Sequence, residues 1–353
     1  MSNRPYLDQI EVDGVTHDIR AANTVPAIEG YGGNDLSEEF ENAAALHAAV
    51  AAGDFSKIRI GDYWPITVAG TYKDFARFTV PSGTTYYTDA ALTTEGGTTS
   101  EAAQGEYQSS TAVKFKVSGN DVYCAIGDCT PGFDKTMNET VIMEVAAINP
   151  YLRMGDTELT AQHILFCSRD CLANTIQMRC ANGVWFDTAQ TNPWLGSAAY
   201  KTLNDDDAAN YTGNGIIKLV KASALGAYIF GGPNGKGMRA YLPTMASGAA
   251  SPTAGQWADR GKLFLPTEAE VYGFNVNAAN GVYGVGMRYN QWPIFNGSAR
   301  HIIKGSGNGG SRCYWWLELA TTASYFAAVR SNGNADYTNA SGAVRVPLCF
   351  LFS

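Results

Sequence analysis

The last seventy or so residues, 283–353, alternate between two kinds of sequence, and this alternation constrains the fold more than any other feature. Short apolar runs at 315–317, 326–329 and 344–352 have the length and the flanking turn residues of buried β-strands. The segments between them are rich in Tyr, Trp, Asn, Ser and Gly and carry few long charged side chains. The pattern predicts a stiff frame of strands, fixed by burial, with aromatic loops on its outer edge.

The composition of these loops favours a binding surface over a catalytic pocket. Antibody paratopes combine rigid amphipathic rings, which supply contact area, with small polar residues, which supply adaptable hydrogen bonds. Exposed aromatic side chains that meet no partner promote unwanted association. We therefore expect the aromatic segments after residue 283 to contact a ligand.

Composition and charge exclude several other classes of protein. An apolar content of 45% with only 16% charged residues indicates a folded chain, and 38 glycines and 19 tyrosines favour β structure with many turns. The net charge of −8 provides no electrostatic footprint for nucleic acid. No apolar stretch approaches the roughly 20 residues that span a bilayer. The first residues lack the apolar core of a signal peptide, so we expect synthesis in the cytoplasm and a final location there or in an assembled particle.

The seven cysteines predict free thiols. Their odd number leaves at least one unpaired within the chain. Most have apolar neighbours, and no second pair has the spacing of a zinc site, so buried thiols are favoured over metal ligands and disulfides. The cysteines are at positions 124, 129, 167, 171, 180, 313 and 349.

Residues 1–54 are expected to form an attachment segment. Apolar and polar residues alternate on either side of Asp13-Gly14, which predicts a two-residue β-hairpin. The hairpin resembles the leader of many phage tail and tail-fibre proteins, where it serves for attachment. Asp35 and Glu38 then have the spacing of a capping box, and apolar residues recur at helical spacing up to Gly53. This predicts one amphipathic helix.

Residues 55–150 are predicted to be β-rich. Candidate strands occur at 58–66, 75–80, 112–117, 122–124 and 141–148. The segment 83–110 is rich in Thr, Ser, Gly and Tyr without apolar periodicity, which indicates an inserted hairpin.

Residues 151–353 complete the chain with a strand at 163–167 and short helices. A helix is expected at 194–203, and 216–220 is either helix or strand. The acidic triplet 205–207 lacks the pattern of an EF-hand loop and is interpreted as a solvated helix end. Thr267 and Glu270 form a capping box that starts a helix, and helix-start electrostatics account for Glu268 and Glu270.

Several motifs in this order resemble the variable proteins of diversity-generating retroelements. Leu-Pro-Thr-Glu-Ala-Glu at 265–270 resembles a helix start of the formylglycine-generating-enzyme type of C-type lectin fold. The segments 315–319, 326–334 and 342–350 resemble the C-terminal strands of the variable proteins. Segments 60–66 and 163–170 resemble a domain of unassigned function from phage and gut-bacterial surface proteins.

The resemblance implies an α+β protein with a C-type lectin fold at the C-terminus and a β-rich N-terminal region. It implies that 151–353 is a display domain whose variable region covers about 285–345. In such systems copying errors at adenines diversify the end of the gene. The candidate ligand-binding residues, which lie between the apolar strand positions, are Tyr289, Asn290, Gln291, Trp292, Ile294, Phe295, Asn296, Ser298, Arg312, Tyr314, Glu318, Ala320, Tyr325, Ala327, Asn332, Asn334, Asp336 and Tyr337.

The resemblance also implies the partners of the chain. These are a host-cell surface protein or glycan at the C-terminal surface and other virion proteins at the N-terminus, with a homotrimer as the assembly. The implied location is a virion tail or tail fibre, or a cell surface. No nucleic acid, membrane insertion, metal or cofactor is expected. The alternatives are a tail protein that is not diversified and a lectin-like adhesin with ordinary loops.

An enzyme of the formylglycine-generating type is a less favoured alternative. That chemistry needs two reactive cysteines close together, whereas Cys313 and Cys349 are far apart and have apolar neighbours. His163 and His301 have no catalytic partner by spacing. Calcium-dependent sugar binding is also disfavoured, because Gln-Trp-Pro at 291–293 is not followed by an acid. We therefore expect a protein that is not an enzyme.

Overall fold

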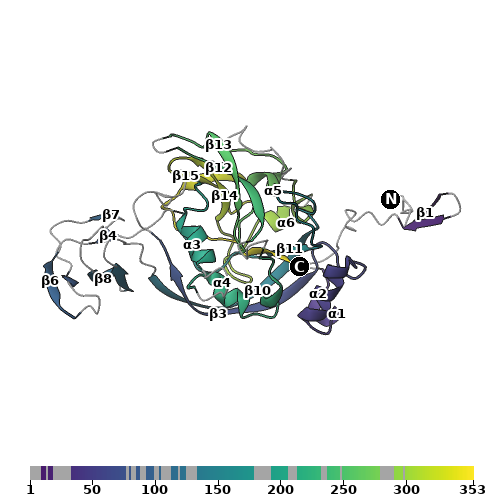
Figure 1. The fold of residues 1–353 in the computed structure, drawn as a ribbon, viewed down its shortest axis with the longest axis horizontal. Helices are drawn as coiled ribbons and strands as arrows, with labels where there is room; N and C mark the ends of the chain where they lie inside the picture. The colour runs from purple at the N-terminus through teal and green to yellow at the C-terminus, as the bar shows by residue number, and fades with distance from the viewer. Residues whose placement is uncertain are drawn as a thin grey trace.

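The computed structural model describes residues 33–76, 93–98, 133–178, 192–205, 213–231, 237–246, 249–278, 290–296 and 299–353, together with the backbone of short strands between residues 9 and 124. The fold combines helices and sheets, with β structure predominating and a curled β half-barrel among its parts (Figure 1). No helix in the described part of the chain is long and apolar enough to cross a membrane.

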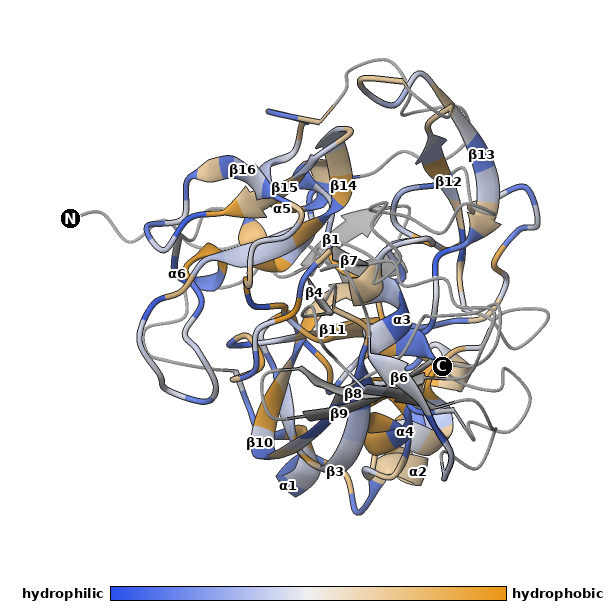
Figure 2. Cartoon of the chain, turned by 90° about the vertical axis from the view of Figure 1, so that its left-hand side faces the viewer, coloured by the Kyte–Doolittle hydropathy of each residue, from blue (hydrophilic) through white to orange (hydrophobic). Residues whose placement is uncertain are grey.

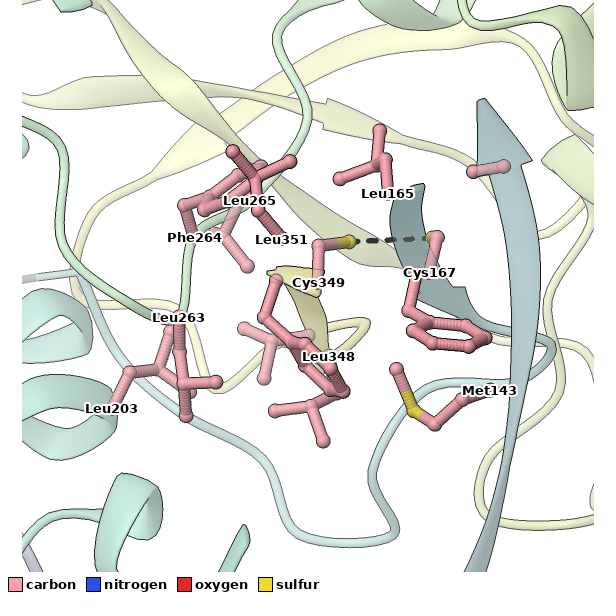
Figure 3. Close-up of a cluster of buried hydrophobic side chains, with 14 of the residues drawn as sticks. Met143, Leu165, Cys167, Leu203, Leu263, Phe264, Leu265, Leu348, Cys349 and Leu351 are labelled. Atoms are coloured by element: carbon pink, nitrogen blue, oxygen red, sulfur yellow. Dashed lines mark hydrogen bonds between the residues drawn. The ribbon is translucent and has the colours of Figure 1, made fainter. Parts of the chain in front are cut away.

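A four-stranded antiparallel sheet with the order β17-β11-β10-β3 forms one wall of the core. Its strands are β3 (Tyr63–Asp74), β10 (Phe133–Ile148), β11 (Ile164–Ser168) and β17 (Cys349–Phe352). Every second residue along the first half of β3 is buried, so one face of this strand packs on the core. All residues of β11 and β17 are buried, because other elements cover both of their faces. Figure 3 shows the apolar side chains that gather around β11 and β17.

A second antiparallel sheet has the order β14-β15-β16. Its strands are β14 (Trp315–Thr322), β15 (Tyr325–Val329) and β16 (Ala335–Asn339). The prediction of buried strands at 315–317 and 326–329 is confirmed. The run 344–352 forms a strand only from Cys349, and this strand pairs with β11 in the other sheet. The expectation that the last strands share one frame is therefore wrong for this strand, because its four residues are all apolar and carry no periodicity to indicate their sheet.

The remaining strands form two-stranded pairs. The N-terminal pair places Val12 opposite Val15, which confirms the predicted hairpin, and residues 13–14 lie outside the described part. Within 83–110 the structure describes residues 85–87, 93–98 and 103–104, and the other residues of the predicted insertion lie outside the described part. The pairs are β1 (Gln9–Val12) with β2 (Val15–Asp18), β4 (Thr79–Val80) with β7 (Ala103–Gln104), β5 (Thr85–Tyr87) with β6 (Glu95–Thr98), β8 (Val113–Val117) with β9 (Asn120–Cys124), and β12 (Arg239–Thr244) with β13 (Ala254–Asp259).

The first helical segment is broken, which corrects the prediction of one helix. α1 (Leu36–Glu39) begins at the cap Asp35, and α2 (Ala43–Ala52) begins at a second cap, Asn42. The Asn42 side chain accepts a hydrogen bond from Ala45 N, so it starts a new helix instead of continuing the old one. α2 ends as predicted at Gly53, whose φ of 71° suits glycine.

The other helices are short. The helix predicted at 194–203 is α3, which begins four residues later, and 216–220 is helical. The helices are α3 (Ala198–Asn204), α4 (Ile216–Lys221), α5 (Glu268–Tyr272) and α6 (Ala299–Ile302), with 3-10 turns η1 (Gly226–Tyr228) and η2 (Pro293–Phe295).

α5 begins with the predicted capping box. Glu270 N donates to the Thr267 hydroxyl (3.2 Å), and Thr267 N donates to the Glu270 carboxylate (2.7 Å). Replacing Thr267 with alanine removes one of these bonds, so we expect the free energy of unfolding to fall by about 1–2 kcal/mol. Urea denaturation measures the change. The Thr267→Ser variant keeps the hydroxyl and should recover most of the stability; equal losses in both variants would show that the cap is not responsible.

Candidate binding surface

Exposed tyrosines gather on the sheet β14–β16. Five large hydrophobic side chains of the described residues are exposed, and three of them are Tyr314 (37%), Tyr325 (37%) and Tyr337 (52%). Tyr314 directly precedes β14, Tyr325 begins β15, and Tyr337 lies in the edge strand β16. With Arg330, which directly follows β15, and Asp336 of β16, these residues are called the tyrosine surface below.

Tyr325 and Tyr337 hold each other's rings in place. Tyr337 is the cross-strand partner of Ala327, so Tyr325 lies diagonally across the β15–β16 pair. The ring centroids are 5.5 Å apart and the planes make an angle of 86°. This edge-to-face arrangement is favourable for aromatic pairs. The two rings therefore offer contact area that is ordered before any ligand arrives.

A polar group lies on the other face of the β15–β16 pair. Asp336 and Tyr337 are consecutive residues of β16, opposite Ala328 and Ala327, so their side chains point to opposite faces of the sheet. The hydroxyl of Tyr314 donates to Asp336 Oδ2 (3.1 Å), and Arg330 Nε donates to the same oxygen (2.8 Å). Partial burial favours a higher pKa for Asp336, but the hydrogen bonds from Arg330 and its other donors outweigh this and lower the pKa. The Arg330 side chain is half exposed, so its outer nitrogens can still donate to a ligand.

The support beneath the surface is rigid. Trp315, Trp316 and Phe326 are fully buried, and each indole N–H donates to a backbone carbonyl, that of Ile302 (3.0 Å) or Ile176 (2.8 Å). β15 is buried on both faces from Phe326 to Val329. Because this support is already ordered, less conformational entropy of the protein is lost when a ligand binds.

The turn after β15 is anchored to a neighbouring helix. Gly333 has a φ of 88°, and its N–H donates to the carbonyl of Arg330 (2.8 Å). The hydroxyl of Tyr272, the last residue of α5, donates to the carbonyl of Gly333 (3.0 Å). Figures 1 and 2 show α5 beside the sheet. These bonds hold Asn332 and Asn334 in place in the turn between β15 and β16.

The structure exposes part of the predicted set of binding residues and buries the rest. Gln291 and Asp336 are half-buried, and Tyr289 and Ser298 lie outside the described residues. The expectation of an outward position is wrong for the buried members. Exposed are Asn290, Asn296, Arg312, Tyr314, Tyr325, Asn332, Asn334 and Tyr337; buried are Trp292, Ile294, Phe295, Glu318, Ala320 and Ala327.

Trp292 is a core side chain, because its polar atom finds a buried partner. Its indole N–H donates to the hydroxyl of Tyr151 (3.1 Å), and its ring stacks on Phe295 at 5.7 Å and 17°. A buried tryptophan is stable where its N–H is satisfied in this way. Ile294 and Phe295 follow in the buried turn η2. This segment therefore supports the core and is excluded from the surface.

Glu318 is buried in a charged network around Arg260. Arg260 donates to both oxygens of Glu270 (2.9 and 2.8 Å), and its Nε donates to Glu318 Oε2 (2.6 Å). Burial raises the pKa of Glu318 to about 8, although the Arg260 charge opposes the shift. All three side chains are fully buried. The network joins the residue after β13 to α5 and β14 and has no access for a substrate.

Sequence reasoning missed Arg330 and Arg260. Arg330 directly follows the buried run of β15 and precedes the Ser-Asn-Gly turn, and this position at the end of a strand was a usable signal. Arg260 had no such signal, because its burial depends on Glu318, 58 residues away.

His163 is held as a neutral ring. Its Nδ1 lies 2.9 Å from the carbonyl of Ala161, and its Nε2 accepts a hydrogen bond from Tyr151 N (3.3 Å). Burial lowers its pKa to about 4. Both nitrogens are thus engaged with backbone groups, which accounts for His163 as a structural residue.

Cys167, Cys171, Cys313 and Cys349 are buried free thiols, as predicted. Cys124 lies in β9, and Cys129 and Cys180 fall outside the described residues. Across the described ranges, no group of three or more His, Cys, Asp or Glu side chains is placed to hold a metal ion.

A separate hollow of about 260 Å³ lies away from the tyrosine surface. Met154, Leu159, Phe230 and Met238 give it an apolar lining, and Arg239 lies among them. Pockets for drug-sized ligands usually have about 300–1,000 Å³. The hollow is below this range and shares no residue with the tyrosine surface.

Compared with protein-family models, with curated proteins and with solved structures, the chain matches none of them. Its functional interpretation therefore depends on the residues and their geometry.

Proposed function

We propose that the chain is a receptor-binding display protein, associated with a phage tail or encoded by a prophage, whose tyrosine surface engages a target on the host cell. The observation that carries the proposal is the contrast within one sheet. Tyr314, Tyr325 and Tyr337 are exposed, whereas the aromatic residues beneath them are fully buried. Large exposed rings on a rigid base are typical of the anchors of binding interfaces.

The strand arrangement supports a C-type lectin fold for residues 151–353. The last strand, β17, returns to pair with β11, the first strand of this segment. The three strands β14–β16 form a separate sheet, and α3 and α4 supply two helices. A small twisted sheet with two helices and long loops is what the motif resemblance implies.

The chemistry of the surface suits a protein or a glycan as target. The rings of Tyr325 and Tyr337 can stack on sugars or on apolar side chains. The Arg330 guanidinium on the opposite face, and the exposed Asn332 and Asn334 of the turn between β15 and β16, can supply hydrogen bonds. Single-site affinity is modest in this proposal, and a trimer attached through the N-terminal hairpin raises it by avidity.

Replacing Tyr314, Tyr325 and Tyr337 together with alanine is expected to abolish binding to host cells while the fold is kept. Anchor residues commonly cost 1–2 kcal/mol or more each, so the affinity should fall at least about a hundredfold. Binding of the labelled full-length chain to a panel of intact bacteria and to a glycan array measures the effect.

Tyr241→Ala is the matched control. Tyr241 also forms an edge-to-face pair across two strands, with Trp257 at 5.6 Å, but on the β12–β13 hairpin. It should leave binding intact. If the triple variant binds as well as the unmodified chain, the tyrosine surface is not a receptor site. The same conclusion holds if the unmodified chain and the triple variant both fail to bind any cell or glycan, and a purely structural tail role is then favoured.

Diversification of this surface by a retroelement is the further part of the proposal. It is restricted to the exposed and half-exposed candidates, since variation at Trp292 or Glu318 would disturb the core. The test is the neighbouring DNA, where we expect a reverse-transcriptase gene and a repeat that matches the codons for about 285–340 except at adenines. A repeat whose mismatches fall at the buried positions instead would overturn this part.

A further inference from the structure

Two buried cysteines face each other across the central sheet. Cys167 of β11 and Cys349 of β17 are direct cross-strand partners, and their sulfur atoms are 3.3 Å apart (Figure 3). Both side chains are almost completely buried among apolar residues. The tyrosine surface includes neither cysteine.

The backbone geometry is suitable for a covalent bond. Cys349 O accepts from Phe264 N (3.0 Å), and Ser168 N donates to Leu348 O (2.8 Å), so the two cysteines occupy a pair of positions that exchange no backbone hydrogen bonds with each other. In such antiparallel pairs the Cα atoms are about 4.5 Å apart, which falls within the range of about 4.4–6.8 Å found for disulfides. Small side-chain rotations can therefore bring the sulfurs to bonding distance.

A buried ammonium group lies next to the pair. Lys304 is 2% exposed, and its Nζ donates to the carbonyls of Ser168 (2.6 Å) and Arg169 (3.2 Å). In the described part of the chain it forms no ion pair with a carboxylate. Burial favours a higher pKa for the Cys167 thiol, but the hydrogen bond from Cys349 and the Lys304 charge hold it below its ordinary value. The thiolate is the reactive form of cysteine.

We propose that Cys167 and Cys349 are an oxidation site at which hydrogen peroxide forms a cross-strand disulfide that joins β11 to the C-terminal strand β17. The Cys167 thiolate attacks one peroxide oxygen, the O–O bond breaks, and hydroxide leaves to give a sulfenic acid. The Cys349 sulfur then attacks the Cys167 sulfur, the S–O bond breaks, and water leaves. Two thiols and one peroxide thus become one disulfide and two waters.

The consequence of this bond is a closed loop that contains the binding sheet. The two cysteines are 182 residues apart, and β14–β16 lie between them in the sequence. Disulfides that close long loops remove the most conformational freedom from the unfolded chain. In oxidising surroundings, the bond would keep β17 in register and stabilise the frame that carries the tyrosine surface.

The test uses the reduced full-length chain, treated with a slight excess of hydrogen peroxide both when folded and during refolding. Remaining thiols are blocked with N-ethylmaleimide under denaturing conditions, and the peptides are mapped by mass spectrometry. We expect the peptide with Cys167 to be linked to the peptide with Cys349, and Tm to rise by at least about 5 °C in a manner that dithiothreitol reverses.

Cys349→Ser should lose both the link and the rise in Tm, whereas Cys313→Ser, which removes another buried thiol, should keep both. The peptide map of the unmodified chain decides the matter even if Cys349→Ser fails to fold. The proposal is overturned if Cys167 and Cys349 both carry N-ethylmaleimide after peroxide treatment, if they are oxidised singly, or if either is linked to a different cysteine.

Discussion

Replacing Arg260 with methionine is expected to lower the free energy of unfolding by about 3–5 kcal/mol, a large share of the 5–15 kcal/mol typical of a domain. Arg260 is fully buried between Glu270 and Glu318 and also donates to the carbonyl of Leu265 (2.7 Å). Without the guanidinium, the Glu270 carboxylate loses its charged partner in the core, and the Glu318 carboxyl group and a buried carbonyl each lose a hydrogen-bond donor. The urea midpoint of unfolding measures the loss.

Arg239→Met is the matched control. Arg239 forms a similar pair with Asp156, but both side chains are about 30% exposed, as their values of 28% and 32% show. Surface pairs contribute about 0–1 kcal/mol, so this variant should unfold close to the unmodified chain. A triple variant with Arg260→Met, Glu270→Leu and Glu318→Leu should regain part of the loss, because the unpaired charge of Glu270 and the unpaired polar group of Glu318 are gone. Equal midpoints for Arg260→Met and Arg239→Met would contradict the network's structural role.

Local signals in the sequence predicted local structure well. The pairing of β1 with β2, the αL end of α2 at Gly53 and the Thr267 cap depend on residues close together in the sequence, and all three were predictable. The break at Asn42 was missed because the apolar spacing continues across it, although asparagine is itself a strong cap. The sheet that receives Cys349–Phe352 could not be predicted, since its partner β11 is far away in sequence.

The same distinction between local and distant partners applies to the candidate site. The exposed tyrosines lie at strand ends and in an edge strand, positions that the alternation of apolar and polar residues indicates. Trp292 and Glu318 also lie between apolar strand positions in the sequence, but both are buried. Trp292 bonds to Tyr151, 141 residues away, and Glu318 bonds to Arg260, 58 residues away, so neither partner is visible in the local sequence. A polar or aromatic residue is drawn into the core by a partner that no local pattern reveals.

Glu318→Gln is expected to remove a dependence of stability on pH between about 4.5 and 8. Burial raises the pKa of Glu318 from 4.5 to about 8 in the folded chain, with the Arg260 charge opposing the shift. Between these values the folded chain keeps a proton that the unfolded chain releases, so this group's contribution is complete below pH 4.5 and is lost as pH rises to 8. This difference between the pKa values of the folded and unfolded chains corresponds to a few kcal/mol of stability at most.

The measurement is the free energy of unfolding of both chains in urea from pH 5 to pH 8.5, because the difference between them isolates Glu318. His163, whose pKa burial lowers to about 4, acts in the opposite direction as pH falls below 6.5, and it cancels because both chains contain it.

The glutamine carbonyl can still accept from Arg260 Nε, and its amide takes the place of Oε1, which has no hydrogen-bond partner among the described residues. We expect the variant to gain stability relative to the unmodified chain as pH rises. A difference that is constant with pH, or that falls, would mean that Glu318 is ionised throughout and that Arg260 balances both carboxylates.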